Sequence, residues 1–294
     1  MSISYPVVLT IATTDSGGGA GIQADLKTIT VLGGYGASVV AALTAQNGAE
    51  VLGIHTLPTD FIRLQYKAVD EGFPIRAAKL GMLFSTPIME TVADMLQNKK
   101  FPLVVDPVSV SQSGYSLLEK DAVATLKQRI LPMADLLTPN RQEAEMLADM
   151  PINSQEDVEE AARRILAFGP KAVLIKGGHF SGGAGFGVTA GKDIVVDWLV
   201  MQGGTIISLA HRWVHTSNNH GTGCTLAAAI ATYLGFGFPL EEAITEAQHF
   251  LTDALRTAFT CGRGPGAPNF LGGALAVLGY CEVYGAGGPK QWRP

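Results

Sequence analysis

Short apolar strands alternate with helical patterns along most of this chain, and this alternation limits the folds open to it. The first pair is a β-branched run at 7–12 followed by helically spaced apolar residues over 22–32. Similar apolar runs recur, with predicted helices between most of them, at 37–42, 77–81, 103–105, 136–138 and 172–176. Strands that are apolar on both faces belong in a parallel sheet covered by helices on both sides. The sequence therefore predicts a doubly wound α/β fold with a mainly parallel sheet.

The stretch from 183 to 210 breaks this alternation. Its segments 186–189, 194–200 and 205–209 have the pattern of antiparallel strands joined by Gly and Asp turns. We therefore expect a small antiparallel edge on the sheet. Because no internal repeat or linker divides the chain, we predict one domain over 1–270 and a C-terminal extension over 271–294.

The composition excludes several classes of function. Hydrophobic residues make up 47% of the 294 residues and charged residues 16%, which is typical of a globular protein with a large core. The net charge of −5, without a Lys/Arg cluster, argues against a nucleic-acid surface. No signal peptide or membrane span is recognisable, and the three distant cysteines fit a reducing compartment. We expect a cytoplasmic protein that binds neither nucleic acid nor membranes.

A glycine turn that leads into an alanine-rich helix is the strongest candidate for a functional site. It has the sequence His220-Gly-Thr-Gly-Cys-Thr-Leu-Ala-Ala-Ala-Ile-Ala-Thr-Tyr-Leu234. The first N–H groups of a helix lack internal partners, and the helix dipole makes this end attractive to anions. Gly221, Thr222 and Gly223 would form the anion site, and Cys224 would lie where a thiol pKa is lowered. A tight turn with a buried, inert cysteine is the alternative, but the agreement of these residues favours chemistry on a phosphate.

The glycine-rich loop at 13–21 allows a different interpretation. Its segment Gly19-Ala-Gly-Ile-Gln-Ala24 fits the G-x-G-x-x-A fingerprint of dinucleotide-binding folds. That fingerprint also needs an acidic residue at the end of the second strand, where no carboxylate occurs before Glu50. A nucleotide-dependent oxidoreductase is therefore a weaker alternative, and it leaves Cys224 unexplained.

Side chains that could bind a ligand follow the predicted strands. In doubly wound sheets, ligands bind at the carboxyl ends of the strands. The residues at these ends are Gln46, Met82, Asp106, Asn140 and Lys176.

Several of these polar residues have both a structural and a functional interpretation. Asn140 and Glu143 have the spacing of a helix capping box, and equally of groups that hold hydrated Mg²⁺ beside phosphates. Asp106 is either a turn residue or a second carboxylate facing the metal. Lys176 is either solvated or close to a nucleotide. Asp25 lies on the first predicted helix. We expect its side chain to face solvent rather than to point inward as a hydrogen-bond acceptor.

Seven segments together resemble the hydroxymethylpyrimidine/phosphomethylpyrimidine kinases of thiamine biosynthesis, within the ribokinase-like family. They occur in the family's order, and the resemblance covers the chain from about residue 7 to about residue 270. The segments are Asp15-Ser-Gly-Gly-Gly-Ala-Gly-Ile-Gln-Ala-Asp-Leu-Lys-Thr28, Ala42-Leu-Thr-Ala-Gln-Asn47, Lys79-Leu-Gly-Met82, Val105-Asp-Pro-Val108, Thr138-Pro-Asn-Arg-Gln-Glu-Ala144, Lys176-Gly-Gly-His179 and His220-Gly-Thr-Gly-Cys-Thr-Leu226.

The resemblance implies a ribokinase-like fold, usually a homodimer, and transfer of the ATP γ-phosphate to a pyrimidine hydroxymethyl group and then to the resulting monophosphate. On the substrate side, it implies that Gln46 and Asp25 recognise the pyrimidine, with Met82 and Ala20 beside it.

The resemblance also assigns the phosphate side. It implies that Asn140 and Glu143 organise Mg²⁺ and the ATP phosphates, and that Lys176 lies near the nucleotide. We expect Asp106 to be the second carboxylate facing the metal and the nucleotide. The turn from Gly221 to Cys224 would be the anion hole, with Cys224 at the position of the general base.

Four positions depart from the family's usual pattern: Thr13, Ser109, Gln112 and Asn219. Thr13 stands where glycine is usual and is expected to narrow the substrate pocket, whereas Gln112 removes a positive charge expected near phosphates. A pyridoxine or pyridoxal kinase with the same anion hole, and a non-catalytic pyrimidine-binding module, are the alternatives within this fold.

Overall fold

A single mixed β-sheet forms the centre of the protein. The computed structural model describes residues 5–109, 122–179, 188–189 and 194–277. Within them the strand order is β10-β9-β7-β6-β5-β4-β1-β2-β3, with β8 paired to β9. The strands are β1 (Val7–Thr13), β2 (Tyr35–Gln46), β3 (Val51–Thr56), β4 (Ile75–Leu80), β5 (Leu103–Val105), β6 (Leu136–Leu137), β7 (Ala172–Ile175), β8 (Val188–Thr189), β9 (Ile194–Met201) and β10 (Ile206–Arg212).

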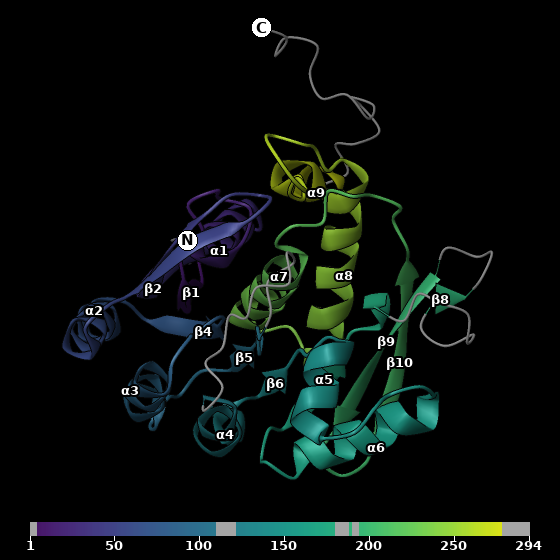
Figure 1. Cartoon of the computed structure of the whole chain (residues 1–294), viewed down its shortest axis with the longest axis horizontal. Helices are drawn as coiled ribbons and strands as arrows, with labels where there is room; N and C mark the ends of the chain where they lie inside the picture. Colours follow the sequence, from purple (N-terminus) through teal and green to yellow (C-terminus); the bar gives the residue numbers. More distant parts are fainter. Residues whose placement is uncertain (1–4, 110–121, 180–187, 190–193, 278–294) are drawn as a thin grey trace, which may run out of the picture.

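Helices cover both faces of this sheet. Figure 1 shows α7 and α8 on one side and α2, α3 and α4 on the other. The helices are α1 (Gly21–Val31), α2 (Thr59–Gly72), α3 (Thr86–Leu96), α4 (Ala122–Thr125), α5 (Arg141–Ala148), α6 (Gln155–Leu166), α7 (Thr222–Phe236), α8 (Leu240–Arg256) and α9 (Phe270–Val277). A π-helical turn, Leu126–Ile130, and a 3₁₀ turn, Leu131–Met133, extend α4.

Side-chain alternation along the strands divides the core in two. Leu9 and Ile11 of β1 belong to the hydrophobic cluster packed under α2 to α6. Val8, directly before Leu9 in the strand, belongs to the cluster packed under α1, α7 and α8. Because successive side chains of a strand point to opposite faces, an uninterrupted apolar run supplies both clusters. The predicted doubly wound sheet with helices on both faces is confirmed.

Antiparallel strands lie at both edges of the sheet. The pairs from β2 through β1, β4, β5 and β6 to β7 are parallel. The predicted antiparallel edge is confirmed at β9 and β10, but β3, which pairs antiparallel with β2, was not predicted. Its segment carries glycine at Gly53 and is at most half-buried along its length, so it lacks the apolar run that identified the other strands.

Two helices add detail to the predicted pattern. Ser85 is the N-cap of α3, although its side chain makes no capping hydrogen bond. The short helix α9 packs against α8, and its Ala274 is buried in the same cluster as Phe250. Residues 271–277 of the predicted extension therefore contribute to the core. Gln112, most of the segment 183–193 and residues 278–294 lie outside the described part of the chain.

The strand order also decides where a ligand can bind. β1 lies between β2 and β4. The connection after β1 therefore leads to β2 on one side, and the chain later returns to place β4 on the other side of β1. Loops leaving neighbouring strands in opposite directions open a crevice at the carboxyl ends of those strands. In this protein that crevice lies beside Thr13 and Met82.

Candidate active site

A cavity of about 680 Å³ opens at the carboxyl ends of the parallel strands. Its lining includes residues at or just beyond the ends of β1, β2, β4, β5, β6 and β7, and the residues at the start of α7. Of the predicted site residues, those that line it are Ala20, Gln46, Met82, Asp106, Asn140, Glu143, Lys176, Gly221, Thr222, Gly223 and Cys224. The fold therefore brings together groups that lie far apart in the sequence.

The start of α7 presents unpaired backbone donors to this cavity. Gly221 is the N-cap residue and adopts a left-handed conformation with φ +82°. The N–H of Thr225 donates to the Gly221 carbonyl, whereas those of Gly223 and Cys224 have no backbone acceptor among the described residues. Free N–H groups at a helix N-terminus attract anions. This geometry fits the predicted anion hole.

The Cys224 thiol is less acidic than its position at the helix start suggests. Its pKa is raised to about 11, mainly because the thiol is buried and in part because of the carboxylates of Asp25 and Asp106. The nearby Lys79 ammonium and the N–H of Gly21 act in the opposite direction. The predicted lowering of the Cys224 pKa is therefore wrong for the protein without a ligand. The cost of burying the thiolate is larger than its stabilisation by the helix N-terminus.

A lysine and two carboxylates face the start of α7. Lys176 Nζ lies 3.0 Å from Asp106 Oδ1. A Cβ atom added to Gly223 would lie 3.4 Å from Asp106 Oδ2 and 3.5 Å from Lys176 Nζ, so the ion pair adjoins the anion hole. Burial alone would lower the pKa of Lys176, but the charge of Asp106 raises it above the ordinary value. Lys176 is therefore a cation.

Glu143 is almost completely buried beside this ion pair. Burial raises its pKa to about 7, while the charge of Lys176 lowers it and that of Asp106 raises it. The capping box is present as well: Asn140 N–H donates to Glu143 Oε2 at 2.8 Å, and Glu143 N–H donates to Asn140 Oδ1 at 2.9 Å. The structural interpretation of this spacing is confirmed, and both residues still line the cavity.

The carboxylates fit a cation that is completed by substrate phosphates. Among the described residues, no group of three or more His, Cys, Asp or Glu side chains could hold a metal ion by itself. Mg²⁺ usually keeps several waters and takes only one or two protein carboxylates together with phosphate oxygens. Asp106 raises the pKa of Glu143, so the two carboxylates repel each other, and a divalent cation would relieve that repulsion.

Asp25 does not line the cavity. Its side chain is completely buried and accepts two hydrogen bonds from Lys79 Nζ, each 2.9 Å, and one from Thr10 Oγ1 at 2.6 Å. The expectation of a solvated helix face is wrong, because α1 packs this face against β1. Burial alone would lower the pKa of Lys79, but Asp25 raises it. Asp25 thus holds a lysine that does line the cavity.

The first glycine loop is occupied by its own aspartate. The carboxylate of Asp15 accepts the N–H groups of Gly17, Gly19 and Ala20 at 2.7 to 3.0 Å. These are the donors that a dinucleotide pyrophosphate would need. The loop is therefore not open to a pyrophosphate, and this geometry argues against the dinucleotide-binding alternative.

The cavity wall combines polar and apolar side chains. Near β1 and β4, the Thr13 hydroxyl donates to the Met82 carbonyl at 3.0 Å, and the Gln46 side-chain amide has no hydrogen-bond partner among the described residues. Another part of the wall comes from β9, β10 and α8, where the apolar Trp213 and Leu255 occur together with the polar Asp197, His211 and Arg212. The cavity thus offers polar groups beside a thioether and, elsewhere on its wall, some apolar surface among charged groups.

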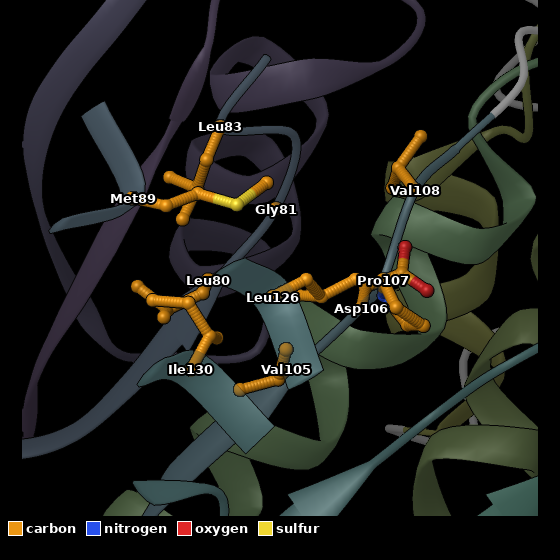
Figure 2. A pocket seen from close by; sticks show the side chains of 10 residues that line it. All are labelled: Leu80, Gly81, Leu83, Met89, Val105, Asp106, Pro107, Val108, Leu126 and Ile130. Atoms are coloured by element: carbon orange, nitrogen blue, oxygen red, sulfur yellow. The ribbon is translucent and has the colours of Figure 1, made fainter. Parts of the chain in front are cut away.

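A second, much smaller cavity, about 10 Å³, lies between β4, β5 and the helical segment after α4. Figure 2 shows the Asp106 carboxylate at one side of it, away from the apolar side chains of Leu80, Val105 and Ile130. The space is too small for an organic ligand. Its apolar packing supports the backbone from which Asp106 reaches the large cavity.

Comparison with known proteins assigns the family. The family described as phosphomethylpyrimidine kinase matches residues 15–269. The chain belongs to the phosphomethylpyrimidine kinase family. It is therefore a kinase, with a ribokinase-like fold.

Similar proteins agree with this family. The chain is 46% identical to the thiamine biosynthesis bifunctional protein ThiED of Geobacter sulfurreducens, over 90% of its own length but 52% of that protein's. It is 41% identical to the hydroxymethylpyrimidine/phosphomethylpyrimidine kinase of Haemophilus influenzae, covering 89% of this chain and 95% of that one. The solved ADP complex of Bacillus subtilis pyridoxal kinase superposes with a TM-score of 0.79 at 32% identity, covering 93% and 100% of the two chains.

Three features of this kinase site were not predicted from the sequence. The first is the Asp25–Lys79 ion pair, which a lysine in the apolar strand at 77–81 could have signalled, since a buried charge needs a partner. The second is the hydrogen bond between Asp15 and His220. The third is the part of the cavity wall formed by β9, β10 and α8, which includes Trp213 and Leu255 and lacks a local motif.

No helix in the described part of the chain is both long and apolar enough to cross a membrane.

Proposed function

We propose that this kinase transfers the γ-phosphoryl group of ATP to the hydroxymethyl oxygen of 4-amino-5-hydroxymethyl-2-methylpyrimidine, and then phosphorylates the monophosphate to the diphosphate. The main support is one juxtaposition: the free N–H groups of Gly223 and Cys224 open into the same cavity as the Asp106–Lys176 ion pair. The relatives named as hydroxymethylpyrimidine/phosphomethylpyrimidine kinases support the choice of substrate.

The pyrimidine would bind in the part of the cavity near β1 and β4. Its amino group and ring nitrogens need hydrogen-bond partners, which the Gln46 amide can provide in both directions. Met82 and Ala20 would contact the ring. Asp25 would act indirectly, by holding Lys79 at the cavity wall.

The phosphates of ATP would lie between Lys176 and the start of α7. A loose phosphoryl-transfer transition state spreads negative charge over the transferring oxygens, so positioning and fixed positive charge supply most of the catalysis. The N–H groups of Gly223 and Cys224 and the Lys176 ammonium are suited to that charge. In this proposal the adenine contacts Trp213 and Leu255, which provide apolar surface on the cavity wall.

Cys224 would accept the hydroxymethyl proton as a thiolate. With a pKa of about 11, roughly one thiol in 10⁴ is ionised at neutral pH in the protein's own field. The carboxylate of Asp106 is one cause of the raised pKa. A cation bound to Asp106 would offset this negative charge, lower the pKa of Cys224 and so favour the thiolate.

Asp106 and Glu143 would hold Mg²⁺, with Asn140 beside them. The ion would supply positive charge to the ATP phosphates. Glu143→Gln is expected to raise the Mg²⁺ concentration needed for half-maximal activity. A loss of thermal stability with an unchanged Mg²⁺ requirement would assign Glu143 to the capping box alone.

The first test is ADP release from Mg-ATP with the pyrimidine alcohol, its monophosphate and pyridoxine in parallel. Turnover of both pyrimidines supports the proposal. Cys224→Ala should abolish this turnover while pyrimidine binding, measured by calorimetry, stays close to that of the wild type. An unchanged kcat in Cys224→Ala would exclude the thiol as the base.

Pyridoxine is the second candidate substrate because of one observation, the similarity to the B. subtilis pyridoxal kinase over its whole chain. Both substrates carry a hydroxymethyl group on a heteroaromatic ring. Turnover of pyridoxine alone would keep the fold and the mechanism but change the substrate. Binding of the pyrimidine without any turnover would favour the non-catalytic module.

A homodimer and a cytoplasmic location remain predictions from the family and the composition. Light scattering of the purified protein is expected to give twice the mass of one chain, which is 30.9 kDa.

A further inference from the structure

Two loops from distant parts of the sequence meet at the edge of the cavity. One is the glycine loop before α1, and the other is the turn before α7. A Cβ atom on Gly221 would lie 1.8 Å from the Gly19 carbonyl oxygen, and a Cβ atom on Gly19 would lie 2.5 Å from His220 Cδ2. The two backbones are therefore in direct contact, and neither glycine can carry a side chain without moving the other loop.

One carboxylate connects these loops by hydrogen bonds. Asp15 is completely buried and accepts the N–H groups of Gly17, Gly19 and Ala20 on its own loop. Its Oδ2 also lies 2.9 Å from His220 Nε2, on the other loop. Because a carboxylate is an acceptor only, His220 must carry a proton on Nε2 in this contact.

The charge of Asp15 is stabilised by these contacts. Burial alone would raise its pKa, but hydrogen bonds from His220 and the loop N–H groups lower it below the ordinary value. A buried carboxylate without such donors would be costly. The backbone of His220 is fixed from the other side, since its N–H donates to the Gly266 carbonyl at 3.0 Å.

Both loops lead directly to reacting groups. Cys224 follows His220 by four residues, in the first turn of α7. Gly21, at the end of the other loop, lines the cavity together with Cys224, and its N–H lowers the pKa of the thiol. A shift of one loop relative to the other would therefore move the thiol and the anion hole away from the substrate side of the cavity.

We propose that Asp15 and His220 form a positioning pair that locks the substrate-side glycine loop to the anion-hole turn. This inference rests on the proposed phosphoryl transfer, for which it names two further residues. Neither side chain acts on the reacting atoms. Their contribution is the relative position of two loops, and displacements of about 1 Å at an active site can reduce turnover about 100-fold.

The test compares His220→Ala, His220→Gln and Asp15→Asn with the wild type. Gln retains an N–H donor near the position of Nε2, whereas Ala removes it. His249→Ala is the matched control, because His249 lies on α8 with 62% of its side chain exposed. The readouts are kcat, KM for the pyrimidine, and hydrogen–deuterium exchange of peptides covering residues 15–21.

His220→Ala is expected to lower kcat about 10- to 100-fold, with less than about a 3-fold change in KM. It should also accelerate exchange at residues 15–21 about 10-fold, the effect of losing one charge-assisted hydrogen bond. His220→Gln should restore most of the lost kcat and most of the protection of residues 15–21 from exchange. The double variant Asp15→Asn/His220→Ala should be no slower than the slower single variant, because both changes break the same contact.

Wild-type exchange and kcat in His220→Ala would overturn the proposal. A His220→Gln variant with normal exchange but the kcat of His220→Ala would also overturn it, since the imidazole would then act on the phosphates directly. If the alanine variant does not fold, Asp15→Asn tests the same contact. A wild-type protein without turnover would refute the proposed function, and exchange at residues 15–21 would still decide whether the pair joins the loops.

Discussion

Removing Lys79 should destabilise the protein far more than removing an exposed lysine. Lys79 and Asp25 are both completely buried, with 2.9 Å between Lys79 Nζ and Asp25 Oδ2. Lys79→Met keeps the length of the side chain but leaves the carboxylate with only the Thr10 hydroxyl as a side-chain partner. Breaking one side of a buried ion pair typically costs about 3–5 kcal/mol, because the remaining charge is uncompensated. We expect a loss of that size in the free energy of unfolding.

Urea unfolding followed by circular dichroism measures this loss, provided that the slope of the transition is unchanged. The matched control is Lys171→Met. Lys171 also pairs with an aspartate, at 2.6 Å from Asp135, but 76% of its side chain is exposed. Exposed ion pairs contribute at most about 1 kcal/mol. The double variant Lys79→Met/Asp25→Asn should recover part of the loss, because it removes the unpaired charge.

Equal effects of Lys79→Met and Lys171→Met would refute the reasoning about burial. A double variant whose loss equals the sum of the two single losses would refute the pairing, since coupled residues give non-additive changes. The same variants test the site. Because Lys79 lowers the pKa of Cys224, Lys79→Met should raise that pKa further.

Three other predictions follow from single positions. Gly221→Ala should lower both stability and activity, because φ is +82° and a Cβ atom would lie 1.8 Å from the Gly19 carbonyl oxygen; a melting temperature and kcat like those of the wild type would contradict this. Ultraviolet titration of the wild type against Cys224→Ser should give a thiolate difference centred near pH 11, and a transition near neutral pH would contradict the dominance of burial. Burial alone would raise the pKa of Asp135, but hydrogen bonds from lysines, including Lys99, lower it. The ionised Asp135 carboxylate therefore stabilises the folded protein at pH values above its unfolded-state pKa of about 3.9. This contribution is lost as the pH falls through the lower folded-state pKa. Asp135→Asn should weaken this acid dependence of the urea midpoint, and an unchanged dependence would exclude Asp135 as its source.

The local pattern of the sequence determined most of the fold. Apolar runs such as 103–105 became strands with the predicted bounds, because a strand that supplies both clusters of the core must be apolar throughout. The polar residues that follow the strands became the wall of the cavity, since parallel strands end at the same edge of the sheet. β3 was missed because an edge strand at most half-buried needs no apolar run.

The contacts between distant residues were decided only by the tertiary structure. Asp25 and Lys79 are 54 residues apart, and Asp15 and His220 are 205 apart, so no local pattern pairs them. Burial decided the charge states as well: it outweighed the helix N-terminus at Cys224 and raised the pKa of Glu143 to about 7. The sequence alone determined which residues reach the carboxyl edge of the sheet, because strand periodicity is local. Desolvation and ion pairing depend on what packs around each group, and only the folded chain sets that.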